Sequence, residues 1–244
     1  MRQFQFGYKN KNALKKELGK IKQWCSRKVT SAVVFHIFAQ LSDKKVIDEI
    51  CSVIDTEMPD AMYVGCSTNG NISDGRISEY VVSITCTVWE FPSTVVETLQ
   101  FKLTTETEKE VTRQIVEKVN SSPWVKSVEM LVTIRGMSMT DFCDDLNEIR
   151  DGVEIYGGGA FNQDINDEST FVFSKNGDFS HTSVAFVLVG GDDLYIETDY
   201  VTGWKPLGRE FHVTKADKST LYELDGKPAY DAYYRYLNIK NDEN

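Results

Sequence analysis

The stretch SAVVFHIFAQLSDKKVIDEICSVIDTEMPDAMYVGC, residues 31–66, decides the fold class of this chain. It opens on a short apolar run rich in Val, Ile and Phe, which predicts a buried strand over residues 31–39. Apolar residues then recur at helical spacing over residues 46–54, and Ser42 is the expected cap of this helix. A second apolar run follows at residues 61–66. Strand–helix–strand implies two parallel strands joined by a right-handed crossover.

The same pattern occurs a second time further along the chain. VKSVEMLVTI predicts a strand, MTDFCDDLNEI a helix and VEIYGGGAF another strand, and together they cover residues 125–161. Tyr63 and Tyr156, each followed within two residues by glycine, lie 93 positions apart. We interpret this recurrence as a degenerate two-fold internal repeat of strand–helix–strand units, at about 30–103 and 125–215.

Strand-like segments fill much of the remaining chain. YVVSITCTVWEF and TVVETLQFKL, on either side of Pro92, predict two strands joined by a hairpin turn or an edge bend. Asn176-Gly177 is a strong turn signal and predicts a hairpin between STFVFSKNGDF and TSVAFVLVGG. LYIETDYVTGW and REFHVTKAD, at 194–204 and 209–217, add two further strands. The expected fold class is α/β (α+β), with mixed β-sheets flanked by helices.

The net charge of −10 is distributed unevenly. The first 30 residues carry +8 and the remaining 214 carry −18, so we expect no nucleic-acid partner for this acidic body. The basic start predicts an amphipathic helix over residues 12–27, within an N-terminal segment, 1–29, that packs on the domain. Contact of this segment with a membrane surface or an acidic partner is the alternative. The apolar stripe of the helix is Leu14, Leu18, Ile21 and Cys25.

The spacing of the cysteines and the length of the apolar runs indicate the cellular compartment in which the chain is expected. The five cysteines are scattered and never in CxxC spacing, which predicts free thiols in a reducing cytoplasm rather than a disulfide scaffold or a zinc ribbon. No apolar run reaches the length of a membrane span, and the first residues lack a signal-peptide core, so we expect a cytoplasmic chain without membrane insertion. The three histidines are isolated, so neither a metal site nor a cofactor is expected.

In each unit, one loop rich in glycine and short polar side chains follows the second strand. GCSTNGN, at 65–71, leaves backbone N–H groups uncovered, and such a loop can bind an anion or a carboxylate with few charged side chains. GGGAFNQD, at 157–164, is its counterpart, and Asn162 lies 93 residues after Asn69. Neither loop has the spacing of a P-loop or of a dinucleotide-binding fingerprint. Close strand packing at a pseudo-symmetric interface is the alternative for both loops.

Two further residues complete the candidate site. Arg135 directly follows a strand and could hold a ligand carboxylate; an ion pair with an acidic neighbour is the alternative. Trp204 could form an aromatic wall or could be a partly buried core residue. The candidate ligand-binding residues are Ser67, Thr68, Asn69, Arg135, Gly158, Gly159, Asn162, Gln163 and Trp204.

Catalytic constellations are sparse in this sequence. Gly65-Cys66-Ser67 lacks the G-x-S-x-G spacing of a nucleophile elbow, because Asn69 occupies the last glycine position. A Cys66–His36 dyad on adjacent strands is the enzymatic alternative, although a cysteine after a strand usually packs inertly. His36 lies within an apolar run, which favours a hydrogen-bonded core histidine. We therefore expect a binding module rather than an enzyme.

Several segments, taken in order, resemble the FIST sensory domain family. MYVGCSTNGNISDG followed by YVVSITCTVWEF is similar to the first part of the family's N-terminal half, and IYGGGAFNQD is similar to its paired-glycine turn. The Asn-Gly turn, the GWKPLG element and the VTKA strand resemble the segments that follow, and LDGKPA resembles the opening of the C-terminal half. The resemblance covers roughly residues 30–237. It implies a FIST N-terminal-like domain at 30–220 and the truncated start of a C-terminal-like region at 221–244.

The resemblance also implies a function. It suggests a cytoplasmic sensory input module that binds a small ligand, such as an amino acid, and signals to an output domain or partner. Diguanylate cyclases, histidine kinases and chemoreceptors are the outputs that it implies. Such signalling requires that the ligand bind one of two states more tightly than the other. A protein-recruiting scaffold that acts through the basic first helix is a further alternative.

Overall fold

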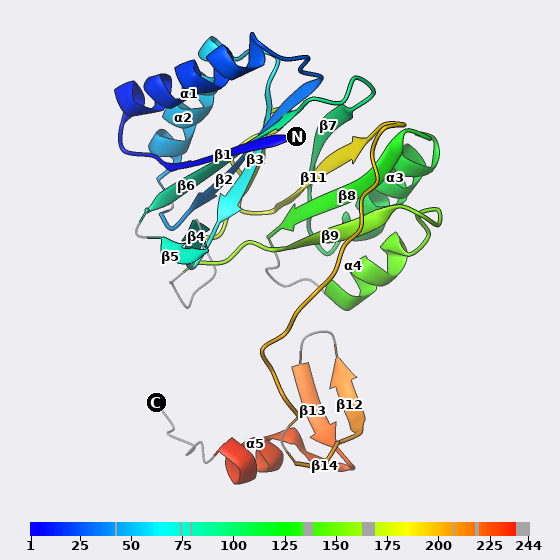
Figure 1. Ribbon diagram of the computed structural model, residues 1–244. Coiled ribbons are helices and arrows are strands. Elements are labelled where there is room, and N and C mark those ends of the chain that lie inside the picture. Colours follow the sequence, from blue (N-terminus) through cyan, green and yellow to red (C-terminus); the bar gives the residue numbers. More distant parts are fainter. Residues whose placement is uncertain are drawn as a thin grey trace.

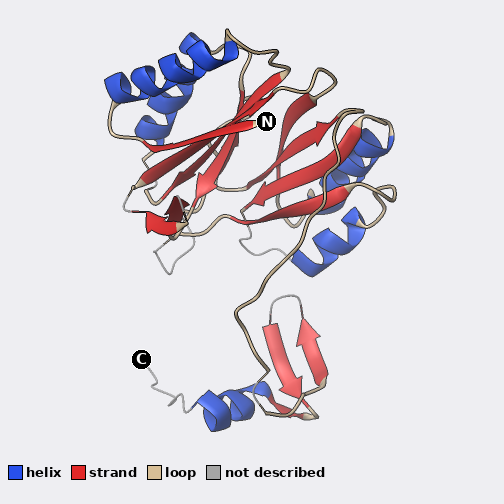
Figure 2. Ribbon diagram, viewed as in Figure 1, coloured by secondary structure: helices blue, strands red, loops and turns tan. Residues whose placement is uncertain are grey.

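The computed structural model describes residues 1–41, 43–73, 75–78, 80–133, 139–162, 169–206, 208–217 and 220–237. Two β-sheets pack face to face, and helices cover their outer faces, so that the main body has four layers (Figures 1 and 2). One sheet has the strand order β1-β6-β2-β3-β10 and the other has the order β7-β11-β8-β9. The predicted fold class, mixed β-sheets flanked by helices, is confirmed.

The first sheet lies between the second sheet and two helices, α1 (Lys11–Cys25) and α2 (Lys44–Glu57). Within the sheet β2 and β3 are parallel, as the strand–helix–strand pattern predicts, and the other pairs are antiparallel. The predicted cap of α2, Ser42, lies outside the described residues; the side chain of Asp43 caps the helix by accepting from the Lys45 N–H at 2.9 Å. The strands are β1 (Arg2–Gly7), β2 (Ala32–Ala39), β3 (Met62–Ser67), β6 (Val82–Trp89) and β10 (Val172–Ser174).

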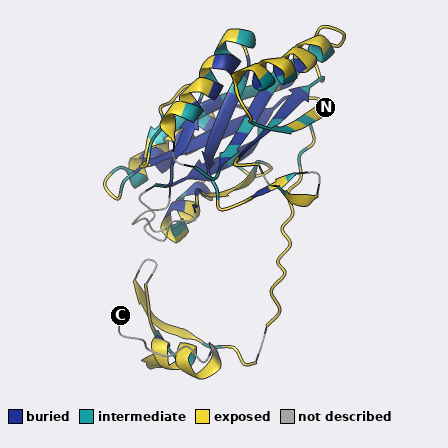
Figure 3. Cartoon of the chain, turned by 90° about the vertical axis from the view of Figure 1, so that its left-hand side faces the viewer, coloured by how far each residue is buried: buried dark blue, intermediate teal, exposed yellow. Residues whose placement is uncertain are grey.

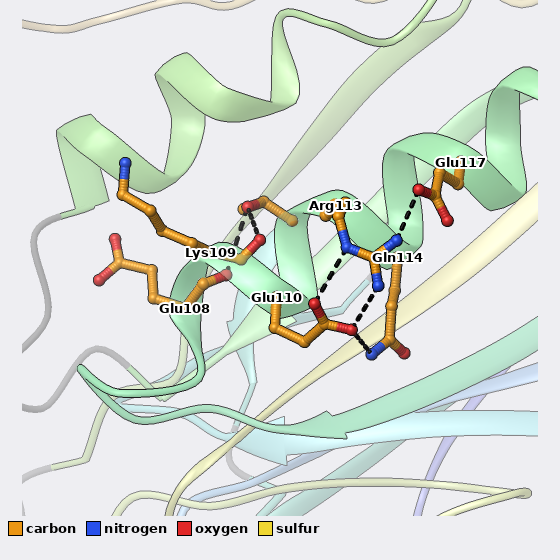
Figure 4. Close-up of polar contacts among 7 residues, drawn as sticks. Glu108, Lys109, Glu110, Arg113, Gln114 and Glu117 are labelled. Carbon is orange, nitrogen blue, oxygen red and sulfur yellow. Dashed lines mark hydrogen bonds and ion pairs between the residues drawn. The ribbon is translucent and has the colours of Figure 1, made fainter.

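The second sheet is covered on its outer face by α3 (Glu108–Asn120) and α4 (Met139–Leu146). α3 buries one apolar stripe and exposes a charged face, on which Arg113 bridges Glu110 and Glu117 (Figure 4). The strands of this sheet are β7 (Val95–Lys102), β8 (Val125–Val132), β9 (Glu154–Gly159) and β11 (Ser183–Gly190). A separate hairpin is formed by β4 (Asn71–Ser73) and β5 (Arg76–Ser78).

The two sheets are built from equivalent units. The element order β1-α1-β2-α2-β3 returns as β7-α3-β8-α4-β9, and the sheet orders β1-β6-β2-β3 and β7-β11-β8-β9 match position by position. β2 and β8 are offset by 93 residues, and β3 and β9 by 92. The observed units therefore begin at β1 and β7, whereas the bounds predicted from the sequence, about 30–103 and 125–215, leave the first strand and helix of each unit outside. The predicted N-terminal segment 1–29 contains β1 as well as the helix α1.

Around Pro92 the hairpin alternative is not formed, and around Asn176-Gly177 the chain makes only a short antiparallel bridge between Val172 and Ser180, so β10 and β11 do not pair with each other. β6 and β7, on either side of Pro92, belong to different sheets, so this junction leads from one sheet to the other. The turn at Asn176-Gly177 exists, and the Gly177 N–H donates to the Ser174 carbonyl at 3.1 Å. It connects β10, which pairs with β3, to β11, which pairs with β7 and β8. Local turn chemistry specifies that the chain bends, but apolar packing decides which strand becomes the partner.

The chain leaves the second sheet through a linker whose described residues, 191–206 and 208–212, form no helix or strand, so the predicted strand 194–204 is not formed. A small C-terminal unit follows, with the strands β12 (Val213–Asp217), β13 (Thr220–Leu224) and β14 (Lys227–Pro228) and the helix α5 (Ala229–Leu237). Ala229 is the one buried residue among the described residues of 197–236, whereas the central strands of the main body are largely buried (Figure 3). No helix within the described ranges is long and apolar enough to cross a membrane.

Candidate functional site

The two sheets face each other through a third core cluster, distinct from the two clusters beneath the helices. Successive side chains of a strand point to opposite faces, so Phe35 and Ile37 of β2 pack under the helices while Val34 and Phe38 face the second sheet. The inward face of β6 carries Ser83, Thr85 and Thr87, in alternation with apolar residues that face the helices. The space between the sheets is therefore partly polar.

A cavity of about 360 Å³ lies between the sheets. Its size is at the small end of the range for ligand pockets, roughly 300–1,000 Å³. Strands of both units contribute to its walls. Its polar lining residues are Gln3, His36, Thr85, Thr87, Glu129 and Tyr156, and the others are Met1, Val34, Phe38, Trp89, Val187 and Val189.

A histidine–carboxylate pair joins the two sheets in this cavity. His36 Nε2 lies 2.8 Å from Glu129 Oε2, and the two side chains are only 20% and 14% exposed. His36 belongs to β2 and Glu129 to β8, and their separation of 93 residues equals the offset between these strands. The pair therefore occupies equivalent positions of the two units and lies across the pseudo-two-fold interface.

The charge of Glu129, together with burial, affects the pKa values of two neighbouring side chains. Burial, and then the negative charge of Glu129, raises the pKa of the Cys66 thiol to about 12. The same two causes raise the pKa of the Tyr156 phenol. On the other side of the cavity, Gln3 Nε2 donates to Thr87 Oγ1 at 3.2 Å. The cavity thus combines one carboxylate with neutral hydrogen-bonding groups.

The two predicted loops meet beyond the carboxyl ends of the parallel strands. The Phe161 N–H donates to the Ser67 carbonyl at 3.1 Å, which joins the segment after β9 to the end of β3. Ser67 is buried, and its hydroxyl accepts from the Phe171 N–H at 3.1 Å. Thr68 donates its hydroxyl to the Gly70 carbonyl at 2.7 Å, and Asn69 is exposed. These short polar groups therefore serve partly to hold the loops together.

The other predicted site residues are distributed differently. Gly158 and Gly159 lie exposed in β9, an edge strand of the second sheet, and Asn162 is buried, with its amide donating to the Ser169 hydroxyl. Trp204 is 90% exposed and belongs to none of the three core clusters, so the structure does not bring it together with the loops. Arg135 and Gln163 lie outside the described residues.

The His36–Glu129 pair is the feature that sequence reasoning missed. The signal was present, because the offset of 93 residues that relates Asn69 to Asn162 also relates His36 to Glu129. His36 is hydrogen-bonded, as predicted, but to a partner in the second sheet. No hydrogen bond joins His36 to Cys66 among the described residues, and a thiol with a pKa of about 12 is a poor nucleophile at neutral pH. The geometry therefore does not favour the Cys66–His36 dyad.

Comparison with known proteins gives two findings. The FIST N domain matches residues 33–227, from the second residue of β2 to beyond the end of β13. The uncharacterized protein MJ1623 of Methanocaldococcus jannaschii is 22% identical over 238 residues, which cover 94% of this chain and 45% of that protein. The chain thus spans about half the length of this curated relative. Because the family match extends over most of the sequence, the chain belongs to the FIST sensory domain family through its FIST N domain.

Proposed function

We propose that this chain is a cytoplasmic sensory input module that binds a small ligand between its two units. The observation that carries this proposal is the cavity of about 360 Å³ with the His36–Glu129 pair. Small-molecule sites are typically concave and apolar, with a few convergent polar groups, and this cavity has that composition. We propose no catalytic role for the chain.

Ligand binding in the cavity could change the position of the linker, because the strand β9 that lines the cavity also contacts the linker. Tyr156 of β9 lines the cavity, and Glu154 of the same strand accepts a hydrogen bond from the hydroxyl of Thr198 in the linker. Leu194 and Ile196 of the linker pack against the core between the sheets. A ligand that prefers one spacing of the sheets would therefore shift the linker as well, and differential affinity for the two states is the requirement for signalling.

The finer parts of the proposal come from the family resemblance and from the predicted loops. An amino acid is the ligand class that the resemblance suggests, and a diguanylate cyclase, a histidine kinase or a chemoreceptor is the proposed output. The loop after β3 and the segment after β9 would form a second contact region for the ligand. Its proposed residues are Ser67, Thr68, Asn69, Gly158, Gly159 and Asn162, together with Arg135 and Gln163; Trp204, which the structure does not bring together with the loops, is not included.

Calorimetric titration of the full chain with a broad panel of small metabolites tests this function. We expect a heat of binding for one chemical class, and we expect Thr87→Leu to abolish it, because this substitution removes a hydroxyl from the cavity wall and puts a bulkier apolar side chain in its place. Thr56→Leu on the exposed face of α2 is the matched control and should bind normally. Circular dichroism establishes that both variants fold. The proposal would be overturned if no compound of the panel gave a heat of binding, or if Thr87→Leu left the binding unchanged.

A further inference from the structure

We infer that the cavity between the sheets selects a small organic amine, whose ammonium group binds the Glu129 carboxylate. The inference rests on the proposed function and specifies the chemistry of its ligand. It differs from the amino-acid ligand that the family resemblance suggests, because it assigns recognition to one charged group of the ligand rather than to two.

The first observation is the incomplete pairing of Glu129. His36 Nε2 contacts Oε2 at 2.8 Å, and no other group among the described residues makes a hydrogen bond or an ion pair with this carboxylate. A carboxylate accepts about four hydrogen bonds, so most of its capacity is unused. The Glu129 side chain is only 14% exposed, so its carboxylate lies largely out of contact with water. A partly buried charge is stabilised by a charged donor, which an ammonium group supplies.

The second observation is the balance of charge around the cavity. Among its lining groups, the described residues offer two cationic candidates, the imidazole of His36 and the N-terminal ammonium of Met1. His36 is already paired with Glu129, and the N-terminus pairs with Glu90 at 3.3 Å. A ligand carboxylate would therefore meet Glu129 without a free cation in the described lining. An amine should bind better than the amino acid with the same side chain.

The third observation is the composition of the walls. The aromatic side chains of Phe38, Trp89 and Tyr156 line the same cavity as the carboxylate. Aromatic faces attract cations, and together with the aliphatic side chains they accommodate the alkyl or aryl part of an amine. The hydroxyls of Thr85 and Thr87 are available in the lining as acceptors for the remaining ammonium hydrogens.

Two matched triads test the inference on the full chain by calorimetry at neutral pH. One is tyramine, tyrosine and 3-(4-hydroxyphenyl)propionate; the other is isoamylamine, leucine and 4-methylpentanoate. We expect the amine of at least one triad to bind roughly tenfold or more tightly than its amino acid, and the acids to bind least. Glu129→Gln should weaken amine binding roughly 10- to 100-fold. Glu117→Gln on the outer face of α3 is the matched control and should leave it unchanged (Figure 4).

The outcomes separate this inference from the proposed function. Tighter binding of an amino acid or an acid, or amine binding that Glu129→Gln does not weaken, overturns the inference while the sensory function stands. If no compound of either triad gives a heat of binding, but another ligand class binds and Thr87→Leu abolishes that binding, the inference is likewise overturned while the sensory function stands. Silence from every class overturns both. If Glu129→Gln fails to fold, the ranking within the wild-type triads decides the question, since it requires no variant.

Discussion

Gly157 and Gly158 are neighbours in β9, yet their surroundings are opposite. Gly157 has a φ of 141°, and a Cβ at this position would overlap the carbonyl oxygen of Met130 on β8. Its equivalent in the first unit, Gly65, is in the same position relative to the carbonyl oxygen of Ile37 on β2. No atom of the described residues lies within 4 Å of a Cβ built at Gly158. Close approach of paired backbones, rather than ligand contact, therefore explains one glycine in each unit.

Gly157→Ala should lower the free energy of unfolding by about 2–4 kcal/mol, because the substitution combines a strained backbone with a steric overlap. Gly158→Ala is the matched control and should change it by less than about 1 kcal/mol. Urea denaturation followed by circular dichroism measures both values. Equal effects of the two substitutions would contradict the backbone packing described for Gly157.

Cys66 and Cys143 differ in their access to solvent. Cys66 is buried with its pKa raised to about 12, whereas Cys143 on α4 is exposed. Because the thiolate is the reactive form, a thiol-directed alkylating agent should modify Cys143 first at neutral pH, and Cys66 only on unfolding. Mass spectrometry of the digested protein identifies the modified sites. Selective labelling of Cys66 would instead support the cysteine-dependent enzyme.

Buried thiols also make stability depend on pH in the alkaline range. Burial is the largest cause that raises the pKa of both Cys51 and Cys66 to about 12, and an unfolded thiol titrates near about 8.5. The raised pKa means that the folded state holds these protons more tightly. The contribution to stability is therefore fully present below about pH 8.5 and is lost as the pH rises toward 12.

The urea midpoint should accordingly fall between about pH 8 and about pH 10.5. Cys66→Ala should show a smaller fall over this interval, since it removes one of the titrating groups. A midpoint that stays constant over the same interval would contradict the burial of these thiols.

At the scale of elements, the spacing of apolar residues predicts well which segments form helices and strands and which face of each is buried. The stripe of Leu14, Leu18 and Ile21 is buried in α1, as its spacing predicts. β1 was missed because it is a short edge strand whose alternating polar residues give a weak signal. The choice of strand partners, as for β6 and β7, depends on contacts distant in sequence that no local pattern carries. For the same reason, reasoning from local patterns did not identify the His36–Glu129 pair.

Substitutions on the two faces of α1 test which face of this helix is buried. Leu18 is fully buried, so Leu18→Ala should cost about 2–5 kcal/mol of stability through lost contacts and a residual cavity. Lys16→Ala on the exposed face of the same helix should change stability by less than about 0.5 kcal/mol. Urea denaturation of both variants measures these differences. A small effect of Leu18→Ala would mean that α1 does not pack on the first sheet as described.

At the scale of the whole molecule, the main body and the C-terminal unit differ in their packing. The three core clusters contain no described residue beyond Ile196, so a chain ending after Asp199 retains all of them. It also retains the hydrogen bond between Thr198 and Glu154. This shortened chain should melt within a few degrees of the full chain in differential scanning calorimetry, about the shift that 1 kcal/mol produces. A much lower melting temperature would show that the C-terminal unit contributes to the core.

β10 belongs by sequence to the second unit but completes the sheet of the first. Phe171, just before it, donates its N–H to the Ser67 hydroxyl across 104 residues, and Phe171 and Phe173 fill the core under α1 and α2. During translation, the nascent chain therefore exposes an unpaired strand edge and an unfilled core until this segment leaves the ribosome. Such an interval is when chaperones engage apolar surface and when unpaired edges aggregate. The first sheet therefore stays incomplete until the second half of the chain has been synthesised.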